Sequence, residues 1–234
     1  MTPRTNARLA GFTFLFYIVI AITEMVLTSR IKSGPSTAAK LANIAQHAPQ
    51  MRLAIVLGML TILCALVLAV TLYSLTRDVD PDLALLAMTC RVTEGVTGIA
   101  PAIASLGLLS LATAAVTATG QEAATVNQLA ALLLRAGGWS MTVGATAFAV
   151  GSTIFAYLFL RARSIPLWLA WLGLGGSLLM VVITPLEGIG LIKGTVMSIS
   201  WAPLFVFEVT LGLWLLIKGI RVPIYLAPRK GSLQ

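Results

Sequence analysis

The sequence predicts an all-α integral membrane protein, a bundle of six transmembrane helices forming a single transmembrane domain over residues 1–234. Of its 234 residues, 58% are hydrophobic and 10% are charged, whereas soluble domains carry about 25% charged residues. Mean hydropathy is +0.95. Four stretches longer than the roughly 20 residues needed to cross a bilayer contain no charged residue: 53–76, 95–121, 136–160 and 164–186.

A first and a last span complete the six. Residues 9–28 are apolar except for Glu24, and residues 195–217 are apolar except for Glu208. The acidic turn at 78–82 sets the start of the third span near Leu83, which places Arg91 and Glu94 inside the membrane. The predicted spans are 9–28, 53–75, 83–112, 138–160, 165–186 and 195–218.

The composition excludes several classes of function. A net charge of +8 without a polar face to carry it does not fit a nucleic-acid partner. Cys64 and Cys90 lie in apolar runs and the only histidine, His47, lies in a polar connection, so no metal or haem site and no cofactor is expected. One histidine in a loop also leaves no Ser-His-Asp or Cys-His set. The sequence therefore weighs against an enzyme without excluding one.

The distribution of basic residues predicts the topology. An even number of spans places both termini on one side of the membrane. Nine Lys and Arg residues fall on that side and six on the other, so the positive-inside rule predicts that both termini are cytoplasmic. The nine are Arg4, Arg8, Arg77, Arg161, Arg163, Lys218, Arg221, Arg229 and Lys230.

The two longer outer connections are predicted to hold short amphipathic helices. Ser36 can cap a helix that ends before Pro49, and residues 121–135 repeat the same helical spacing of apolar side chains. Both segments suit packing at the outer membrane surface. A lid over a cavity is the alternative interpretation.

Three ionisable residues are predicted to share one depth in the bilayer. With a rise of about 1.5 Å per residue, Arg91 lies about 12 Å from the inner end of its helix, and Glu94 and Glu208 each lie about 16 Å from theirs. Glu208 can approach the other two only if the third and sixth spans are neighbours, and we expect Arg91, Glu94 and Glu208 to tie these two spans together. A charge near the bilayer centre costs about 2.5–3.5 kcal/mol on insertion scales, so these residues need partners.

Two interpretations of this cluster remain open. One guanidinium facing two carboxylates leaves an excess negative charge, which predicts that Glu94 or Glu208 holds and exchanges a proton. A proton or a cation would then be the natural third party. The alternative is that Arg91 clamps the third and sixth helices together with no turnover.

Two prolines predict kinks above this level. Pro101 and Pro203 each remove one helical hydrogen bond, which frees the carbonyls of Thr97 and Ile199. Kinks there could open the outer half of the bundle. The resulting pocket would be lined by Gly95, Gly98, Glu24 and Glu208.

Two other readings of these residues involve no ligand. The prolines can be tolerated bends, and Glu24 can reach toward Arg30 or Arg52 at the outer surface. Small residues explain close helix packing on the fourth and fifth spans. They are Ser140, Gly144, Ala147, Gly151, Gly173 and Gly176.

Several short motifs resemble one family of membrane proteins. They are Arg8-Leu9-Ala10-Gly11, Cys90-Arg91-Val92-Thr93-Glu94, Ile165-Pro166-Leu167-Trp168-Leu169-Ala170, and Glu208 followed by Gly212-Leu213-Trp214-Leu215-Leu216-Ile217-Lys218-Gly219. In their order and spacing the chain resembles the bacterial family catalogued as domain of unknown function 4386. The resemblance implies six helices in a bacterial inner membrane and carries no chemistry.

The leading hypothesis is a multi-pass membrane protein that binds or transports a small solute, ion or lipid, with or without a linked proton. Its candidate site residues are Arg91, Glu94, Glu208 and Glu24. One alternative is a non-catalytic membrane regulator or assembly partner, suggested by short inner segments and the basic tail at 221–230. The last is an intramembrane enzyme that uses Glu94 and Glu208 as acid and base. The sequence does not predict an oligomeric state.

Overall fold

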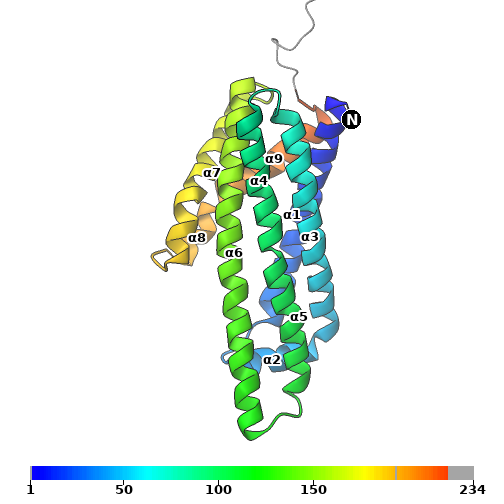
Figure 1. Cartoon of the computed structure of the whole chain (residues 1–234), viewed down its shortest axis with the longest axis vertical. Coiled ribbons are helices and arrows are strands. Elements are labelled where there is room, and N and C mark those ends of the chain that lie inside the picture. The colour runs from blue at the N-terminus through cyan, green and yellow to red at the C-terminus, as the bar shows by residue number, and fades with distance from the viewer. Residues whose placement is uncertain (1, 193, 221–234) are drawn as a thin grey trace, which may run out of the picture.

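The computed structural model describes residues 2–192 and 194–220, and within these ranges the chain forms nine α-helices and no strand. Most helices follow one long axis, and α2 lies across the bundle near one end (Figure 1). The helices are α1 (Pro3–Ile31), α2 (Thr37–Gln46), α3 (Ala48–Thr76), α4 (Pro81–Thr97), α5 (Ile99–Ala114), α6 (Gly120–Ala162), α7 (Leu167–Gly188), α8 (Thr195–Ser200) and α9 (Ala202–Ile217).

Six segments among the described residues are long and apolar enough to cross a membrane. They are α1, α3, α4 with α5, α6, α7, and α8 with α9. The predicted all-α fold with six candidate spans is confirmed. Many large apolar side chains lie on the outside of the bundle, among them Phe12, Val19 and Trp171. In a multi-pass membrane protein these side chains contact the lipid bilayer.

The spans pack in chain order around a closed ring. α1 packs on α3, α3 on α4 and α5, these two on α6, α6 on α7, α7 on α9, and α9 on α1. Neither α4 nor α6 packs against α9. The prediction that the third and sixth spans are neighbours is therefore wrong. They face each other across the ring because α1 and α7 flank α9 on its two sides.

Two separate hydrophobic cores hold the bundle together. The larger core fills the end that carries the start of α1 and the end of α9, with Phe14, Leu72, Phe155 and Leu215 among its members. The smaller core joins α2 to the far ends of α1, α3, α5 and α6 through residues such as Leu41, Ile44 and Leu108. The two cores lie at opposite ends of the bundle, and few residues of its middle belong to either one. The middle is therefore the less tightly packed part.

Small residues allow the helices of the larger core to approach closely. A Cβ placed on Gly11 of α1 would lie 2.5 Å from the backbone nitrogen of Leu216 and 2.6 Å from the carbonyl oxygen of Gly212, both on α9. A Cβ on Gly151 of α6 would lie 3.1 Å from the carbonyl oxygen of Ala87 on α4. Only glycine permits such backbone proximity, so these positions fix how the helices cross.

Both spans with a predicted kink are broken at that point. The third span changes from α4 to α5 at Gly98, and the sixth changes from α8 to α9 at Trp201. Pro101 has no N–H to give to the carbonyl of Thr97. The hydroxyl of Ser140 on α6 donates to this oxygen at 2.6 Å instead. A neighbouring helix thus satisfies the carbonyl that the proline frees.

The two outer amphipathic segments differ from the prediction in one respect. The first is the separate helix α2, and the hydroxyl of Ser36 accepts a hydrogen bond from the Ala39 N–H at its start. The second is not separate, because residues 121–135 continue without a break into the fourth span as the 43-residue helix α6. This segment contains no proline, and Gly137 and Gly138 alone do not end a helix. At about 1.5 Å per residue, α6 is about 64 Å long.

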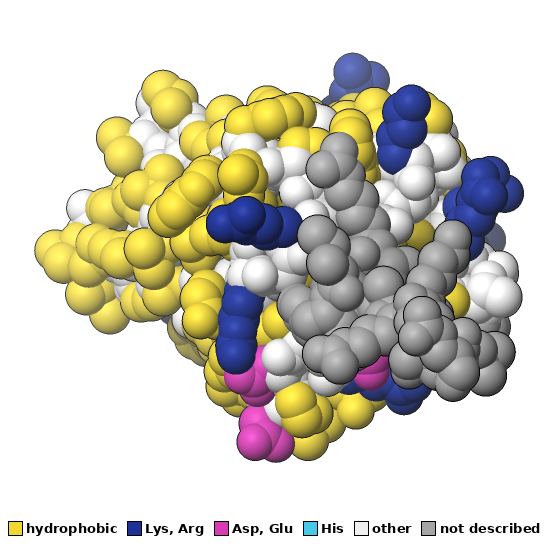
Figure 2. Space-filling model, turned by 90° about the horizontal axis from the view of Figure 1, so that it is seen from above, with side chains coloured by type: hydrophobic (Ala, Val, Ile, Leu, Met, Phe, Trp, Pro, Cys, Tyr) yellow, Lys and Arg dark blue, Asp and Glu magenta, His cyan; other side chains and the backbone are white. Residues whose placement is uncertain are grey.

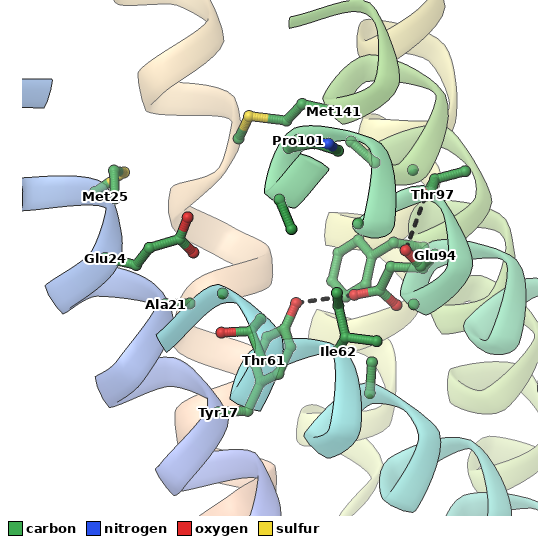
Figure 3. A pocket seen from close by; sticks show the side chains of 18 of the residues that line it. Tyr17, Ala21, Glu24, Met25, Thr61, Ile62, Glu94, Thr97, Pro101 and Met141 are labelled. Atoms are coloured by element: carbon green, nitrogen blue, oxygen red, sulfur yellow. Dashed lines mark hydrogen bonds between the residues drawn. The ribbon is translucent and has the colours of Figure 1, made fainter. Parts of the chain in front are cut away.

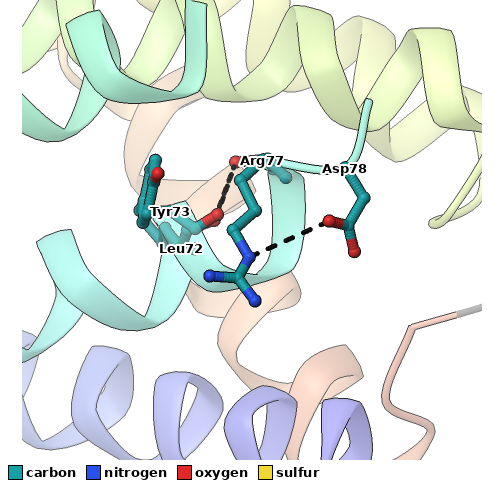
Figure 4. Close-up of polar contacts among 5 residues, drawn as sticks. Leu72, Tyr73, Arg77 and Asp78 are labelled. Carbon is teal, nitrogen blue, oxygen red and sulfur yellow. Dashed lines mark hydrogen bonds and ion pairs between the residues drawn. The ribbon is translucent and has the colours of Figure 1, made fainter. Parts of the chain in front are cut away.

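The first and the last described residues lie at the same end of the bundle (Figure 1). Figure 2 shows Lys and Arg side chains spread over this end, with acidic side chains gathered at one edge. Arg77 and Asp78 are one neighbouring pair, 3.8 Å apart and largely exposed, next to the end of α3 (Figure 4). The predicted basic tail at 221–230 lies outside the described residues.

The crossing of α1 and α9 gives a first prediction. Gly11→Ala should lower the free energy of unfolding by about 1–3 kcal/mol, because its methyl group would overlap the α9 backbone. Gly175→Ala is the matched control, since a Cβ on Gly175 of α7 would meet no atom within 4 Å. Thermal unfolding of both variants in the same detergent measures the difference. Equal midpoints would contradict the close packing of α1 on α9.

The start of α4 gives a second, pH-dependent prediction. Asp80 accepts a hydrogen bond from the Leu83 N–H and pairs with Arg161 on α6 at 2.9 Å. These contacts, first the backbone bond and then Arg161, lower the pKa of Asp80. A lowered pKa stabilises the fold above the unfolded-state pKa, and the effect is lost as acid protonates the folded carboxylate.

Asp80→Asn should therefore be less stable than the wild type near neutral pH, with the difference closing as pH falls below about 3.9, the ordinary value for Asp. Asp78→Asn is the control, because its carboxylate is largely exposed. Unfolding midpoints at a series of pH values test this. A difference for Asp80→Asn that does not change with pH would rule out the ion pair as its cause.

Candidate functional site

A cavity of about 510 Å³ lies between the two hydrophobic cores, within the ring of spans. Side chains from α1, α3, α4, α5, α6 and α9 line it, and α7 contributes none. Most of the lining is apolar. Three glutamates interrupt it: Glu24, Glu94 and Glu208 (Figure 3 labels the first two). The cavity lies beside both helix breaks, since Gly98 and Trp201 line it as well.

The periodicity of the helices explains which residues reach the cavity. On α9 the lining positions are Trp201, Leu204, Phe205 and Glu208, which follow the i, i+3, i+4, i+7 spacing of one helix face. On α1 one face brings Tyr17, Ile18, Ala21, Glu24, Met25 and Thr28 to the same space. Each span that lines the cavity gives it one face and leaves its other faces for neighbouring helices or lipid.

Arg91 and Glu94 form an ion pair at the floor of the cavity. The Nη1 atom of Arg91 lies 3.0 Å from Oε2 of Glu94, three residues along α4. The hydroxyl of Tyr17 on α1 donates to Oε1 of the same glutamate at 2.8 Å (Figure 3). Both oxygens of Glu94 thus have a partner. These contacts join α1 to α4, which are not adjacent in the ring.

The guanidinium of Arg91 is held between two aromatic rings below the cavity. Its Cζ lies 4.8 Å from the centroid of Phe148 on α6 and 5.9 Å from that of Phe14 on α1. The side chain is 1% exposed and does not line the cavity. No guanidinium nitrogen makes a well-aligned hydrogen bond to the described residues. Ion-pair and cation–π contacts therefore provide its stabilisation.

Glu208 lies in the cavity wall without a partner. Its residue is 8% exposed, yet among the described residues it accepts no hydrogen bond and has no cation within 4.0 Å. It lines the same cavity as Glu94. The predicted link from Arg91 to Glu208 across the third and sixth spans is thus not formed, because α4 and α9 do not pack together. The two glutamates share a space but not an arginine.

Glu24 points into the outer part of the cavity (Figure 3). Its carboxylate faces Gly58 of α3, where an added Cβ would lie 3.5 Å from Oε1. It forms no ion pair with Arg30 or Arg52 among the described residues, so the alternative reading of an outward-reaching side chain is wrong. Lys32, just past the end of α1, donates to the Ser105 hydroxyl at 3.1 Å. Burial lowers the pKa of Lys32, and the nearby Glu24 opposes this shift.

The family model described as domain of unknown function (DUF4386) matches residues 9–219. The chain belongs to this family. No curated protein and no solved structure matches the chain. Membership in the DUF4386 family confirms the predicted resemblance, and the family brings no activity with it.

Two polar residues at the site of this DUF4386 member were not among the predicted site residues. Tyr17 precedes Glu24 by two helical turns, so the two share a face of α1. Tyrosines are common in apolar spans, so the spacing from Glu24 was the only indication in the sequence that Tyr17 belongs to the site. Lys32 follows Glu24 by eight residues, but it counted only as an outer charge. Neither assignment is possible without knowing which face of α1 points inward.

Metal chemistry gains no support from the site. The described residues contain no group of three or more His, Cys, Asp or Glu side chains placed to hold a metal ion. Cys64 and Cys90 are free thiols and do not line the cavity. The cavity can offer carboxylates, a phenol, small hydroxyls and aromatic faces. Such a set suits binding and proton exchange.

The Arg91–Glu94 pair of the DUF4386 protein gives a third prediction. Glu94→Leu should lower the free energy of unfolding by about 3–5 kcal/mol, because it leaves a buried guanidinium without a counter-charge. The double variant Arg91→Met/Glu94→Leu should cost clearly less, since it removes both charges and keeps apolar volume. Denaturant titrations in mixed micelles measure both. If the double variant is the less stable one, the two charges do not compensate each other.

Proposed function

We propose that this protein binds a small, largely apolar molecule in the intramembrane cavity and transports it, with a proton exchanged at Glu208. The observation that carries the proposal is a single space of about 510 Å³ that holds three glutamates between two packed cores. Charged groups within a membrane segment are costly and mark ligand or proton pathways. The proposed setting is the bacterial inner membrane, with both termini in the cytoplasm.

The shape of the wall supports access from the lipid. Met25 on α1 is 57% exposed, Met141 on α6 is 67% exposed and Phe205 on α9 is 45% exposed, and all three line the cavity. A side chain that both lines a cavity and lies on the outer surface stands at its rim. Because these three apolar side chains are exposed on the outside of a membrane-spanning bundle, this rim would face the hydrocarbon. An apolar ligand would enter along that side.

The broken helices support a transport role. Transporter sites near the middle of the membrane are typically built from discontinuous helices. Here α4 and α5 meet at Gly98, and α8 and α9 meet at Trp201, and both residues line the cavity. A break gives a helix a place to change its angle. The bundle thus has two hinge points beside the space where the ligand would lie.

Glu208 is the preferred proton site. Glu94 already accepts from Tyr17 and pairs with Arg91, so losing its charge would leave Arg91 uncompensated. Glu208 has neither constraint among the described residues, and it borders the cavity. A proton can therefore come and go at Glu208 without unpairing a buried cation.

A fourth prediction tests binding itself. Three probes share a benzyl group and a tetrahedral head and differ in charge: benzyltrimethylammonium, neopentylbenzene and phenylmethanesulfonate. At least one should raise the unfolding temperature of the wild type in a saturable way. At a ligand concentration a hundredfold above Kd, the free energy of unfolding should increase by about 2.7 kcal/mol. Gly58→Leu should abolish this effect, because its side chain would extend into the cavity beside Glu24.

Gly138→Leu is the matched control, since an added Cβ there meets no atom within 4 Å and Gly138 does not line the cavity. Ala21→Leu is a second cavity-filling variant in case Gly58→Leu unfolds. The same pair of glycine variants in liposomes loaded with the bound probe tests transport, where only Gly58→Leu should stop release. Probe binding that is unchanged in both Gly58→Leu and Ala21→Leu would contradict the proposal.

A further inference from the structure

The charges around the cavity do not balance. Glu94 is matched by Arg91 at 3.0 Å, and Lys32 lies near Glu24 at the outer end. Glu208 has no such partner among the described residues. Three carboxylates and two cations leave one negative charge in a largely apolar space. A low-dielectric site resists this charge, so one positive charge, a proton or a cation, completes it.

The groups that face Glu208 do not remove this excess. Tyr17 comes from α1, and Glu94 and Arg91 come from α4 across the ring. The only ionisable side chain on α7 and α8 is Glu187, which does not line the cavity. Glu208 is also the only ionisable residue of α9. The basic residues of α1, which packs on α9, are Arg4, Arg8 and Arg30, and none of them lines the cavity.

Aromatic side chains line the same cavity as the Glu208 carboxylate. Tyr17, Phe148, Trp201 and Phe205 all line the cavity, and the rings of Phe148 and Trp201 stack with centroids 5.9 Å apart. Ring faces attract organic cations, and quaternary ammonium groups are commonly held by aromatic walls beside a negative charge. An anion would meet three carboxylates there. Both existing cations are already engaged, Arg91 with Glu94 and Lys32 with Ser105.

Resting on the proposed function, we propose that the ligand is a lipophilic organic cation, an amine or quaternary ammonium carrying apolar groups, whose positive charge replaces the proton on Glu208. The cation binds as Glu208 gives up one proton to water, so charge is conserved in the cavity. The apolar groups of the ligand fill the remaining wall and extend toward the rim at Met25 and Met141. Ligand and proton therefore compete for one carboxylate.

The test compares the same three probes by charge alone. Benzyltrimethylammonium should bind the wild type at least tenfold more tightly than neopentylbenzene or phenylmethanesulfonate, and binding should release one proton per chain. Its affinity should fall tenfold for each unit by which the pH decreases, in the acidic range where Glu208 is protonated. Isothermal titration calorimetry in two buffers of different ionisation enthalpy measures both affinity and proton release.

Glu208→Gln should remove the preference for the cation, the proton release and the pH dependence together, whereas Glu208→Asp should keep part of each. Glu122→Gln removes the same charge from an exposed site at the start of α6 and should behave as the wild type. Equal binding of cation and neutral isostere by the wild type would overturn the cation assignment and leave the cavity function standing. Absence of binding by all three probes would overturn the cavity function instead.

Discussion

Burial of one guanidinium sets the organisation of this bundle. Arg91 lies in the third span with 1% of its side chain exposed, and no water-facing route is open to it. Glu94 supplies its counter-charge from the next turn of α4, while Phe14 and Phe148 supply ring faces from α1 and α6. Three spans therefore meet at one charged side chain. A charged group within a membrane segment needs partners of this kind.

This requirement divides the bundle into a packed half and an open half. Below Arg91 the spans approach closely through Gly11, Gly151 and Gly173 and share the larger core. Above it the helix breaks at Gly98 and Trp201 and the separate core around α2 leave the cavity. The Tyr17–Glu94 hydrogen bond lies at the boundary. The ion pair thus forms the floor of the cavity and separates it from the larger core.

Hydropathy and proline positions were sufficient to predict six candidate spans and the breaks near Pro101 and Pro203. These properties depend on one helix at a time. The order of spans around the ring depends on which faces fit together, so the sequence wrongly made α4 and α9 neighbours and joined Arg91 to Glu208. Tyr17 was not predicted as a site residue for the same reason, because the sequence does not show which face of α1 points inward. The continuous helix α6 was missed because an amphipathic segment and an apolar span can share one axis when no proline intervenes.

The arrangement explains why two glutamates at one depth would differ in chemistry. Glu94 is fixed by Tyr17 and Arg91, and protonating it would strand a buried cation. Glu208 lies on α9, which α1 and α7 flank, and no described cation lies within 4.0 Å of its carboxylate. With α4 and α9 apart, Glu94 has both a hydrogen bond and an ion pair, whereas Glu208 has neither among the described residues. A direct contact with Arg91 would have given the Glu208 carboxylate a counter-charge and removed the need for a cationic ligand. The proposed function therefore requires that this predicted contact is absent.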